Sequence, residues 1–294
     1  HYITMGLKKL DIEDWLQVDN TYPEFYTARS HILETQKEEA LQVTPSGEEA
    51  CEELMELVVE FLLEKYPRFF EIVETNGRKK IRNNIVKEEI SIQKPYDVHP
   101  LEVCARLCVE DFNILQKSEF SGEHYLVASA TIFPAGWRLR ERIGKSVTDL
   151  HGPVPLWKGK LSKPVEHYFT RLSTNSYMER HSFFIQINPD DRPLSQLLFI
   201  QRGQDFYPGK VGNFSPPYFI IRRERQTFRR LPKSNTVVFT VKTSVQKLTD
   251  LPAEGRRGLV KEIRSWPDDI KEYKGLQFWK KPVFAFCEGQ NRAE

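Results

Sequence analysis

The amino-acid sequence predicts an α+β fold in which helices flank an antiparallel sheet. Segments with helical spacing of apolar residues lie toward both ends of the chain. Between them, short runs rich in β-branched and aromatic residues are separated by turn-forming residues such as Asn188-Pro189-Asp190 and Pro216-Pro217. Strands that are grouped together, instead of alternating regularly with helices, are typical of the α+β class.

The first 120 residues are expected to form a mostly helical elaboration. Ser46 is a suitable N-cap for a helix that Pro67 would end. The apolar residues of this helix form a stripe at helical spacing, made of Leu54, Leu57, Val58, Phe61 and Leu62. A second helix is predicted over residues 99–117, with Pro100 in its first turn. Residues 79–92 are expected to be strand or loop.

Residues 121–250 are expected to form the sheet core. The runs assigned to strands are residues 124–133, 181–188, 194–202, 217–224 and 236–244. A helix is predicted over residues 161–173, because Val165, Tyr168, Phe169 and Leu172 recur at helical spacing. Helices are expected again over residues 251–294. The chain has no internal repeat or low-complexity linker, so one domain over residues 1–294 is the simplest division.

The composition is that of a soluble globular protein and argues against a nucleic-acid binder. The formal net charge is only +2 over 294 residues, whereas nucleic-acid-binding domains usually carry a strong basic excess. No apolar run reaches the roughly 18 residues of a membrane span, and the chain does not open with a signal-peptide pattern. A cytoplasmic location is therefore expected, with a removed N-terminal targeting segment left open. No sequence feature indicates an oligomeric state.

The four cysteines are predicted to be ordinary thiols. Cys104 and Cys108 lie one helical turn apart on an apolar face, which is typical of buried side chains. The spacing of the four cysteines resembles neither a zinc site nor an iron–sulfur ligand set.

The segment RRERQTFRR holds five arginines and a single carboxylate, Glu224. On a strand, Arg222, Glu224 and Gln226 would share one face, and Arg223 and Arg225 would share the other. An arginine that points inward must be paired with an anion or an acceptor. Nucleic acid, an anionic ligand and a solvated face are three interpretations of this segment, and the small net charge disfavours the first.

His151 lies in a stiff part of the chain. Pro153 and Pro155 fix φ on either side of Val154. An axial metal ligand needs such a backbone, because one imidazole nitrogen binds the metal while the other is held by an acceptor. The alternative is that His151 only caps a turn. Before it, residues 134–136 are predicted to form a turn, and the basic residues that follow are predicted to lie on a solvated amphipathic helix with Arg138 and Arg142 on one face.

Three motifs in the chain are distinctive when taken together. They are a Phe-Pro…Trp segment, a His-x-Pro-Val-Pro segment and an Arg-x-Glu-Arg-Gln-Thr-(Leu/Phe)-x-Arg-Leu-Pro segment. The matching positions are Phe133, Pro134 and Trp137, then His151, Pro153, Val154 and Pro155, and finally residues 222–232. With these motifs, most of the chain resembles the haem-dependent oxidative N-demethylase-like family of bacteria and fungi.

The resemblance implies a PAS-like core in which an antiparallel sheet and flanking helices enclose haem b. It also implies oxidative N-demethylation of a small secondary amine, such as dimethylamine, with dioxygen consumed and formaldehyde released. Electrons would come from a separate reductase with flavin and iron–sulfur centres, because this chain carries neither a dinucleotide-binding motif nor a cluster-binding cysteine set.

The resemblance also assigns roles to residues. His151 is the expected iron ligand, with His167 and His181 as fallbacks. Glu224 would attract the protonated amine or accept its proton, and Arg180 and Arg222 would complete the catalytic group. The residues expected to bind the haem are His151, Trp137, Pro153, Val154, Phe183, Arg225 and Arg230, with the arginines directed at its propionates.

One element departs from the family pattern. Where the family has Arg-x-Asn-Trp, this chain has Arg180, then Ser182 and Phe183. The change removes a side-chain amide and a ring N–H, so haem binding is compatible with loss of demethylase activity. A non-catalytic haem-binding sensor or carrier is the alternative function, and a haem-free module whose arginines bind an acidic partner is a third.

Overall fold

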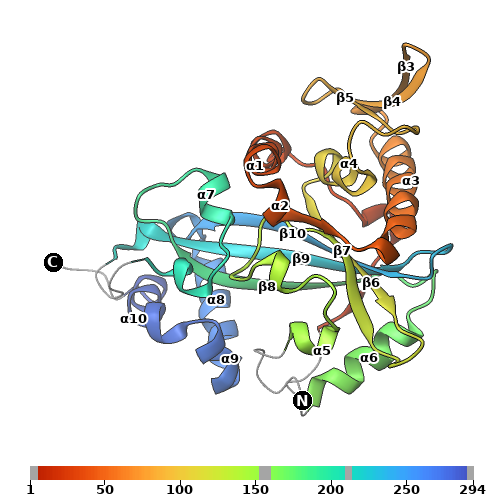
Figure 1. The fold of residues 1–294 in the computed structure, drawn as a ribbon. Helices are drawn as coiled ribbons and strands as arrows, with labels where there is room; N and C mark the ends of the chain where they lie inside the picture. Colours follow the sequence, from red (N-terminus) through yellow and green to blue (C-terminus); the bar gives the residue numbers. More distant parts are fainter. Residues whose placement is uncertain (1–5, 152–159, 209–213, 290–294) are drawn as a thin grey trace.

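The computed structural model describes residues 6–151, 160–208 and 214–289 (Figure 1). Its main feature is a seven-stranded antiparallel sheet. The strands, in spatial order, are β1 (Lys8–Lys9), β8 (Met178–Ile187), β9 (Phe219–Arg230), β10 (Val237–Lys247), β6 (Glu110–Lys117), β7 (His124–Ala130) and β2 (Leu41–Val43). A separate small sheet consists of β3 (Phe70–Thr75), β4 (Arg78–Asn83) and β5 (Glu88–Ser91).

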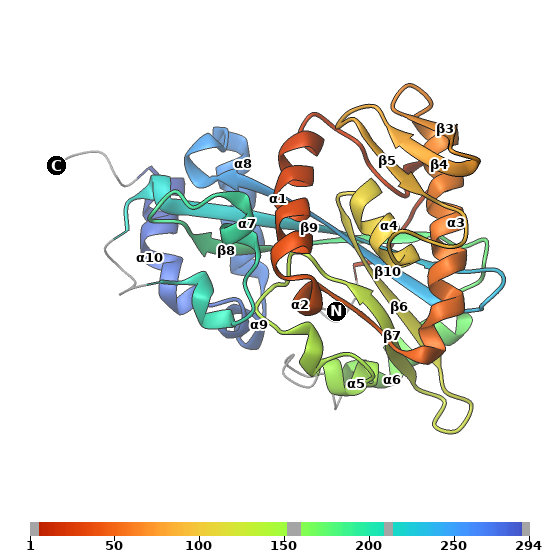
Figure 2. The same cartoon turned by 45° about the horizontal axis from the view of Figure 1, so that its top comes forward.

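Helices lie on both sides of the central sheet and at one end of it (Figures 1 and 2). Above it in Figure 1 lie α1 (Tyr22–Thr35), α3 (Glu48–Lys65) and α4 (Pro100–Leu107). Below it lie α5 (Val147–Leu150), α6 (Ser162–Arg171) and α9 (Asp268–Tyr273). The remaining helices are α2 (Lys37–Ala40), α7 (Leu194–Leu198), α8 (Ala253–Ser265) and α10 (Leu276–Cys287). This mixture of helices and antiparallel strands confirms the α+β prediction.

The sheet takes strands from most of the chain. β6 ends before residue 120 and β7 begins after it, yet the two are neighbours in the sheet. β1 and β2 also come from the segment that was expected to be mostly helical. One sheet built from both sides of residue 120 supports the proposal that the chain is a single domain.

Two predicted elements were wrong in type. The helix predicted over residues 99–117 ends at Leu107, and its second half is β6. β6 lies between β10 and β7 and is buried on both faces, and its buried positions include the polar residues Asp111 and Asn113, so burial along it does not follow a simple apolar alternation. The strand predicted over residues 194–202 begins instead as the short helix α7, which directly follows Pro193. The strand-or-loop segment at 79–92 is strand in β4 and β5.

The start of α3 also differs from the prediction. Its N-cap is Gly47 instead of Ser46, whose hydroxyl lies 3.1 Å from that of Thr44. A Cβ added to Gly47 would lie 2.6 Å from the carbonyl oxygen of Val127. Only glycine lets the helix start this close to β7. The amphipathic helix expected after the turn at residues 134–136 is reduced to one 3-10 turn, Leu139–Glu141.

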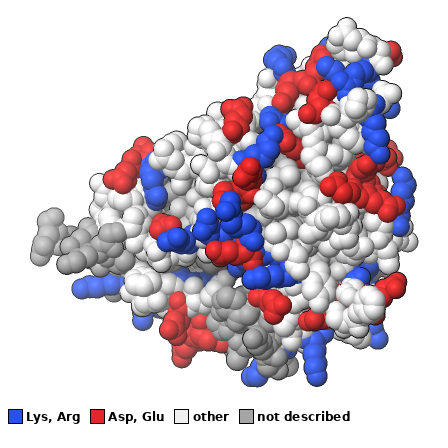
Figure 3. Space-filling model, viewed as in Figure 1, with Lys and Arg blue, Asp and Glu red and all other residues white. Residues whose placement is uncertain are grey.

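The other predicted strands and helices are confirmed. Each overlaps β7, β8, β9, β10, α6, α8, α9 or α10. Cys104 and Cys108 are buried free thiols, as predicted, and burial raises the pKa of both well above its usual range. No helix in the described part of the chain is long and apolar enough to cross a membrane. On the face shown in Figure 3, cationic and anionic side chains are interspersed.

Candidate functional site

A cavity of about 550 Å³ lies between the central sheet and the helices α5, α6 and α9. The strands β6 to β10 form its floor, and the segment after β7 contributes Trp137 and Arg142. Its size is within the range of about 300–1,000 Å³ that is typical of small-molecule and cofactor sites.

The wall of the cavity is mostly apolar, with a few ionisable groups. Its larger apolar and aromatic side chains are Leu115, Leu126, Val147, Leu150, Leu161, Val165, Phe169, Phe228, Phe239 and Val241. Its charged and histidine side chains are Asp111, Arg142, His151, Arg180, His181, Glu224, Asp269 and Lys274. A mostly apolar wall with a limited number of placed charges is typical of a cofactor or substrate pocket.

Glu224 on β9 is linked to Arg180 on β8 through Gln226. The Gln226 amide nitrogen donates to Glu224 Oε2 over 3.1 Å, and Arg180 Nε donates to the Gln226 oxygen. All three side chains line the cavity. The predicted alternation along β9 is therefore confirmed for Glu224 and Gln226, which face the same side.

Arg222 lies beside Glu224 but outside the cavity wall. It is fully buried, and its two terminal nitrogens donate to the carbonyl oxygens of Phe133 at 2.6 Å and Leu198 at 3.3 Å. Its Nε is 3.8 Å from Glu224 Oε1. Arg222 thus ties β9 to the segment after β7 and to α7, and places a cation behind the Glu224 carboxylate.

Arg230 stabilises the end of α6. Its guanidinium donates to the carbonyl oxygens of Phe169 and Leu172, and also to that of Asn235. The last carbonyl groups of a helix lack partners within the helix, and the helix dipole favours a cation there. Arg230 was expected to bind a propionate. In the structure it lies outside the cavity, and its guanidinium is hydrogen-bonded to backbone carbonyl oxygens instead.

Arg225 is on the opposite face of β9. It binds Glu179 and the backbone oxygens of Asp14 and Trp15, and it does not line the cavity. Of the five arginines in the stretch, only Arg223 is exposed. The segment is therefore neither a solvated face nor a surface patch for nucleic acid. Arg222, Arg225 and Arg230 instead donate hydrogen bonds to backbone carbonyl oxygens of the segments around the cavity.

His151 lies at the C-terminal end of α5, a single turn of helix. Ser146 begins the turn by accepting a hydrogen bond from the Asp149 amide. His151 Nδ1 is 2.9 Å from the carbonyl oxygen of Val147. A carbonyl only accepts, so Nδ1 carries the proton and the neutral ring has its lone pair on Nε2.

Burial lowers the pKa of His151 to about 4, and the positive charges of Arg180 and Arg142 act in the same direction. The hydrogen bond to the Val147 carbonyl acts to raise the pKa of His151, but its effect is smaller than that of burial. The imidazole is therefore neutral at physiological pH. A neutral imidazole with its other nitrogen held by a carbonyl is the form that binds a metal ion.

The other predicted residues divide into three groups. Trp137 lines the cavity, where the guanidinium of Arg142 lies 4.3 Å from its ring centroid. Phe183 packs behind the wall against Trp266, with ring centroids 5.1 Å apart. Pro153 and Val154 lie outside the described residues.

The two fallback histidines are both exposed. His167 lies on the outer side of α6, away from the cavity. His181 borders the cavity, and its Nε2 is 3.7 Å from Glu179.

Lys274 was not identified from the sequence. It follows α9 and lines the cavity, and its Nζ donates to Ser182 Oγ at 3.2 Å and to the Phe183 carbonyl at 2.6 Å. Ser182 and Phe183 are the positions at which the chain departs from the family pattern. A lysine in a polar helical segment carries no sequence signal of burial, so only the tertiary structure identifies it.

From the sequence, Tyr168 was predicted only to be one of the regularly spaced residues of the helix over residues 161–173. It lines the cavity, and its hydroxyl is buried without a hydrogen-bond partner among the described residues. Burial raises its pKa to about 12. A buried hydroxyl without a partner is costly, so a polar group of a bound ligand is its natural partner.

The Lys274 ammonium should make stability depend on pH. Burial lowers its pKa to about 8, although Glu224 acts to raise it. The unfolded chain, with the ordinary lysine pKa, then binds more protons between pH 8 and 10.5. The lowered pKa of Lys274 therefore reduces the free energy of unfolding. This reduction is complete below pH 8 and disappears as the pH rises to 10.5.

We therefore expect Lys274→Met to remove this dependence. Relative to wild type, its free energy of unfolding should decrease by up to about 3 kcal/mol between pH 8 and 10.5. Urea unfolding of both proteins across this range measures the difference, and a difference independent of pH would contradict the prediction.

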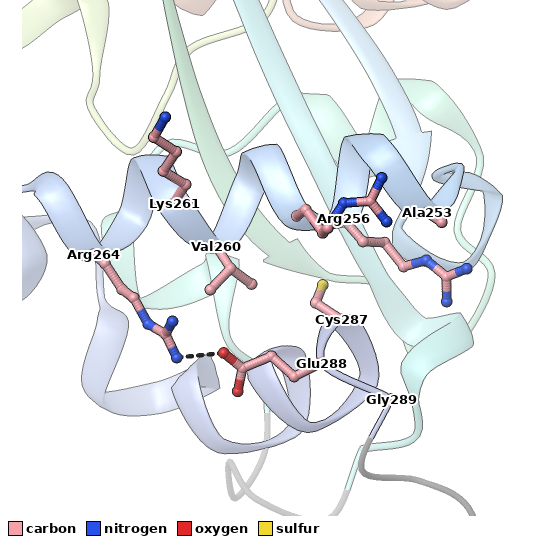
Figure 4. A pocket seen from close by; sticks show the side chains of 9 residues that line it. Ala253, Arg256, Val260, Lys261, Arg264, Cys287, Glu288 and Gly289 are labelled. Atoms are coloured by element: carbon pink, nitrogen blue, oxygen red, sulfur yellow. Dashed lines mark hydrogen bonds and ion pairs between the residues drawn. The ribbon is translucent and has the colours of Figure 1, made fainter.

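A second cavity, of about 570 Å³, lies between α8 and α10 (Figure 4). Its cations are Arg256, Arg257, Lys261 and Arg264. Figure 4 shows Lys261 pointing away from Glu288, whereas Arg264 pairs with it. Because these cations do not converge on one point, we interpret this groove as a solvated basic face of α8.

Within the described residues, no group of three or more His, Cys, Asp or Glu side chains is placed to hold a metal ion. His151 and His181 both line the cavity, and one partly buried, neutral histidine such as His151 is the arrangement suited to a metal carried by a macrocycle. Comparison with protein families gives a separate finding. The model of the family described as haem-dependent oxidative N-demethylase, alpha subunit-like, matches residues 6–284, so the chain belongs to that family.

Proposed function

We propose that the protein binds haem b in the cavity below the central sheet and oxidatively demethylates a small amine there. The observation that carries this proposal is the pairing of two groups in one apolar cavity. His151 supplies a neutral imidazole, and Glu224 supplies a carboxylate. An iron ligand and a partner for a cationic amine are what the reaction requires.

The residues of the cavity fit a haem. The apolar and aromatic side chains of the wall suit a flat macrocycle, and Arg142 and Arg180 suit its propionates. Neither arginine has a carboxylate within 3.5 Å among the described residues, and burial lowers the pKa of both. His151 would bind the iron through Nε2. When bound, the haem supplies the activation of dioxygen.

Glu224 is placed to receive the substrate. A small secondary amine is a cation at neutral pH, and a carboxylate in an apolar cavity attracts it more strongly than one in water. Gln226 and Arg222 hold the carboxylate from two sides. Glu224 would orient the ammonium and accept its proton before the N-methyl group is attacked. The Tyr168 hydroxyl offers a further polar contact.

The reaction consumes dioxygen, two electrons and two protons for each methyl group. One oxygen atom leaves in formaldehyde and the other in water, and the nitrogen regains a proton. We propose that a separate reductase carrying flavin and iron–sulfur centres supplies the electrons, because the cysteines are free thiols and no group of three or more ligating side chains is placed together within the described residues.

The test is amine-dependent release of formaldehyde. The purified protein, loaded with haem, is given dimethylamine, dioxygen and an artificial electron donor. We expect formaldehyde in proportion to amine consumed, above the background of free hemin. Release at background across small methylamines would favour the sensor or carrier. A protein that takes up no hemin would instead favour the haem-free interaction module.

Glu224→Gln should separate turnover from haem binding. The amide keeps the shape of the side chain but neither attracts a cation nor accepts its proton. We expect the rate of formaldehyde release to fall by at least about 100-fold, with haem content unchanged.

Glu179→Gln is the matched control, because Glu179 is on the adjacent strand, pairs with Arg225 and does not line the cavity. Loss of haem or of soluble protein in Glu224→Gln would indicate that Glu224 is only a structural partner of the arginines.

A further inference from the structure

Lys274 is held firmly in the wall of the cavity. Its own carbonyl oxygen accepts hydrogen bonds from the Tyr207 hydroxyl at 2.9 Å and from Trp279 Nε1 at 3.1 Å. The next residue, Gly275, has φ of +72°, and a Cβ there would lie 2.5 Å from the Tyr207 hydroxyl. The junction between α9 and α10 is therefore built around a glycine, and it directs Lys274 toward β8.

The ammonium lies beside β8. Among the described residues, β1 pairs with β8 only at Met178 and Glu179. Lys274 Nζ binds the Phe183 carbonyl and the Ser182 hydroxyl. It also lies 4.7 Å from the ring centroid of Phe184 and 4.8 Å from that of Trp266. These contacts are the cation–π and hydrogen-bond contacts of a desolvated ammonium.

The ammonium has unused binding capacity. It carries three N–H donors, and two have acceptors among the described residues. Among the described residues, no carboxylate oxygen lies within 4.0 Å of Lys274 Nζ. A half-buried lysine without a carboxylate partner is unfavourable, and its lowered pKa reflects that cost. Such a group is a ready partner for an anion that enters the cavity.

Lys274 and Glu224 line the same cavity and are close enough for each charge to influence the other, yet they do not form an ion pair. We propose that the substrate is an N-methylated amino acid, whose ammonium is bound by Glu224 and whose carboxylate is bound by Lys274. One zwitterionic ligand would then pair with the Lys274 ammonium and with the Glu224 carboxylate, which lines the cavity beside Arg222. This inference rests on the proposed function and narrows its substrate class.

A haem propionate is the competing source of a carboxylate for Lys274. The haem brings two propionates, and the cavity wall offers Arg142 and Arg180 besides Lys274. Arg180 is tied to Gln226 and Arg142 stacks on Trp137, and both keep guanidinium donors for carboxylates. Two arginines for two propionates leave Lys274 for the substrate.

The experiment measures binding to the haem-loaded protein by calorimetry without an electron donor. The probes are dimethylamine, N-methylglycine and 4-(methylamino)butanoate, which add a carboxylate at a short and a longer spacing. We expect at least one carboxylated probe to bind about tenfold or more tightly than dimethylamine. If neither does, the inference is overturned.

Variants of Lys274 identify the residue responsible. Lys274→Met should weaken the preferred carboxylated probe by about 10- to 100-fold. It should also bind dimethylamine more tightly, because a cation that repels the ammonium has been removed. Lys274→Arg should restore part of the preference. Lys271→Met is the matched control, because Lys271 is on α9, pairs with Asp268 and does not line the cavity.

Two further results distinguish the alternatives. If Lys274→Met loses haem and keeps the preference, Lys274 binds a propionate and the inference fails. Tight binding of a carboxylated amine without formaldehyde release would overturn the demethylase proposal but leave this inference intact. Formaldehyde from dimethylamine with no preference for a carboxylated amine would overturn this inference alone.

Discussion

The His151→Ala variant is expected to fold and to lose most of the haem that the wild-type protein binds. Changes to groups that merely orient a metal-binding histidine typically cost about 10- to 100-fold in affinity. Removing the imidazole itself should exceed that, so haem affinity should fall by more than about 100-fold. The measurement is the Soret absorbance per mole of protein, with circular dichroism to confirm the fold.

His167→Ala is the matched control, because His167 is exposed on α6 and lies outside the cavity. It should retain haem and an unchanged spectrum. Free imidazole added to His151→Ala should restore part of the haem absorption by replacing the lost ligand. An unchanged haem content and spectrum in His151→Ala would refute the assignment of His151 as the iron ligand.

Asp111→Ala should cause the largest loss of stability. Asp111 on β6 is buried and binds Arg29 Nη1 over 2.6 Å. It also accepts hydrogen bonds from the backbone N–H groups of Ile132 and Phe133, each at 3.0 Å. The variant would leave a buried guanidinium and two buried donors without their acceptor. Breaking a buried ion pair in this way costs about 3–5 kcal/mol.

Urea unfolding measures this loss, and Asp97→Ala is the control. Asp97 pairs with Arg78, but half of its side chain is exposed, so we expect a cost of about 1 kcal/mol or less. Asp111→Asn retains one acceptor oxygen, so its loss in the free energy of unfolding should lie between those of Asp111→Ala and Asp97→Ala. Equal costs for Asp111→Ala and Asp97→Ala would show that the buried pair does not hold the segment after β7.

Elements with a single clear periodicity were predicted well. The strands β7 to β10 and the helix α6 were recognisable because each buries one face or is bounded by turn residues. β6 was missed because its sequence, EDFNILQK, mixes three apolar residues with five polar or charged ones, so it shows no clear strand period although the strand is buried on both faces. α7 was missed because five residues are too few to show a helical period.

The candidate site was predicted in part. The sequence motifs identified His151, Glu224, Arg180 and Trp137, and the structure places all four on the wall of one cavity. They also identified Arg222, Arg225 and Arg230, which the structure uses to hold backbone carbonyl oxygens around that cavity. A motif records which side chains occur together, but not whether each one points to a ligand or to the protein.

The sequence by itself determined the family, the α+β class and the alternation that puts Glu224 and Gln226 on one face of β9. These features are local, because strand geometry and motif spacing depend on neighbouring residues. Only the tertiary structure decided which groups share the cavity. Lys274 and Tyr168 meet Glu224 there because packing brings α9 and α6 against the sheet. Charges about 50 residues apart along the chain become neighbours only through that packing.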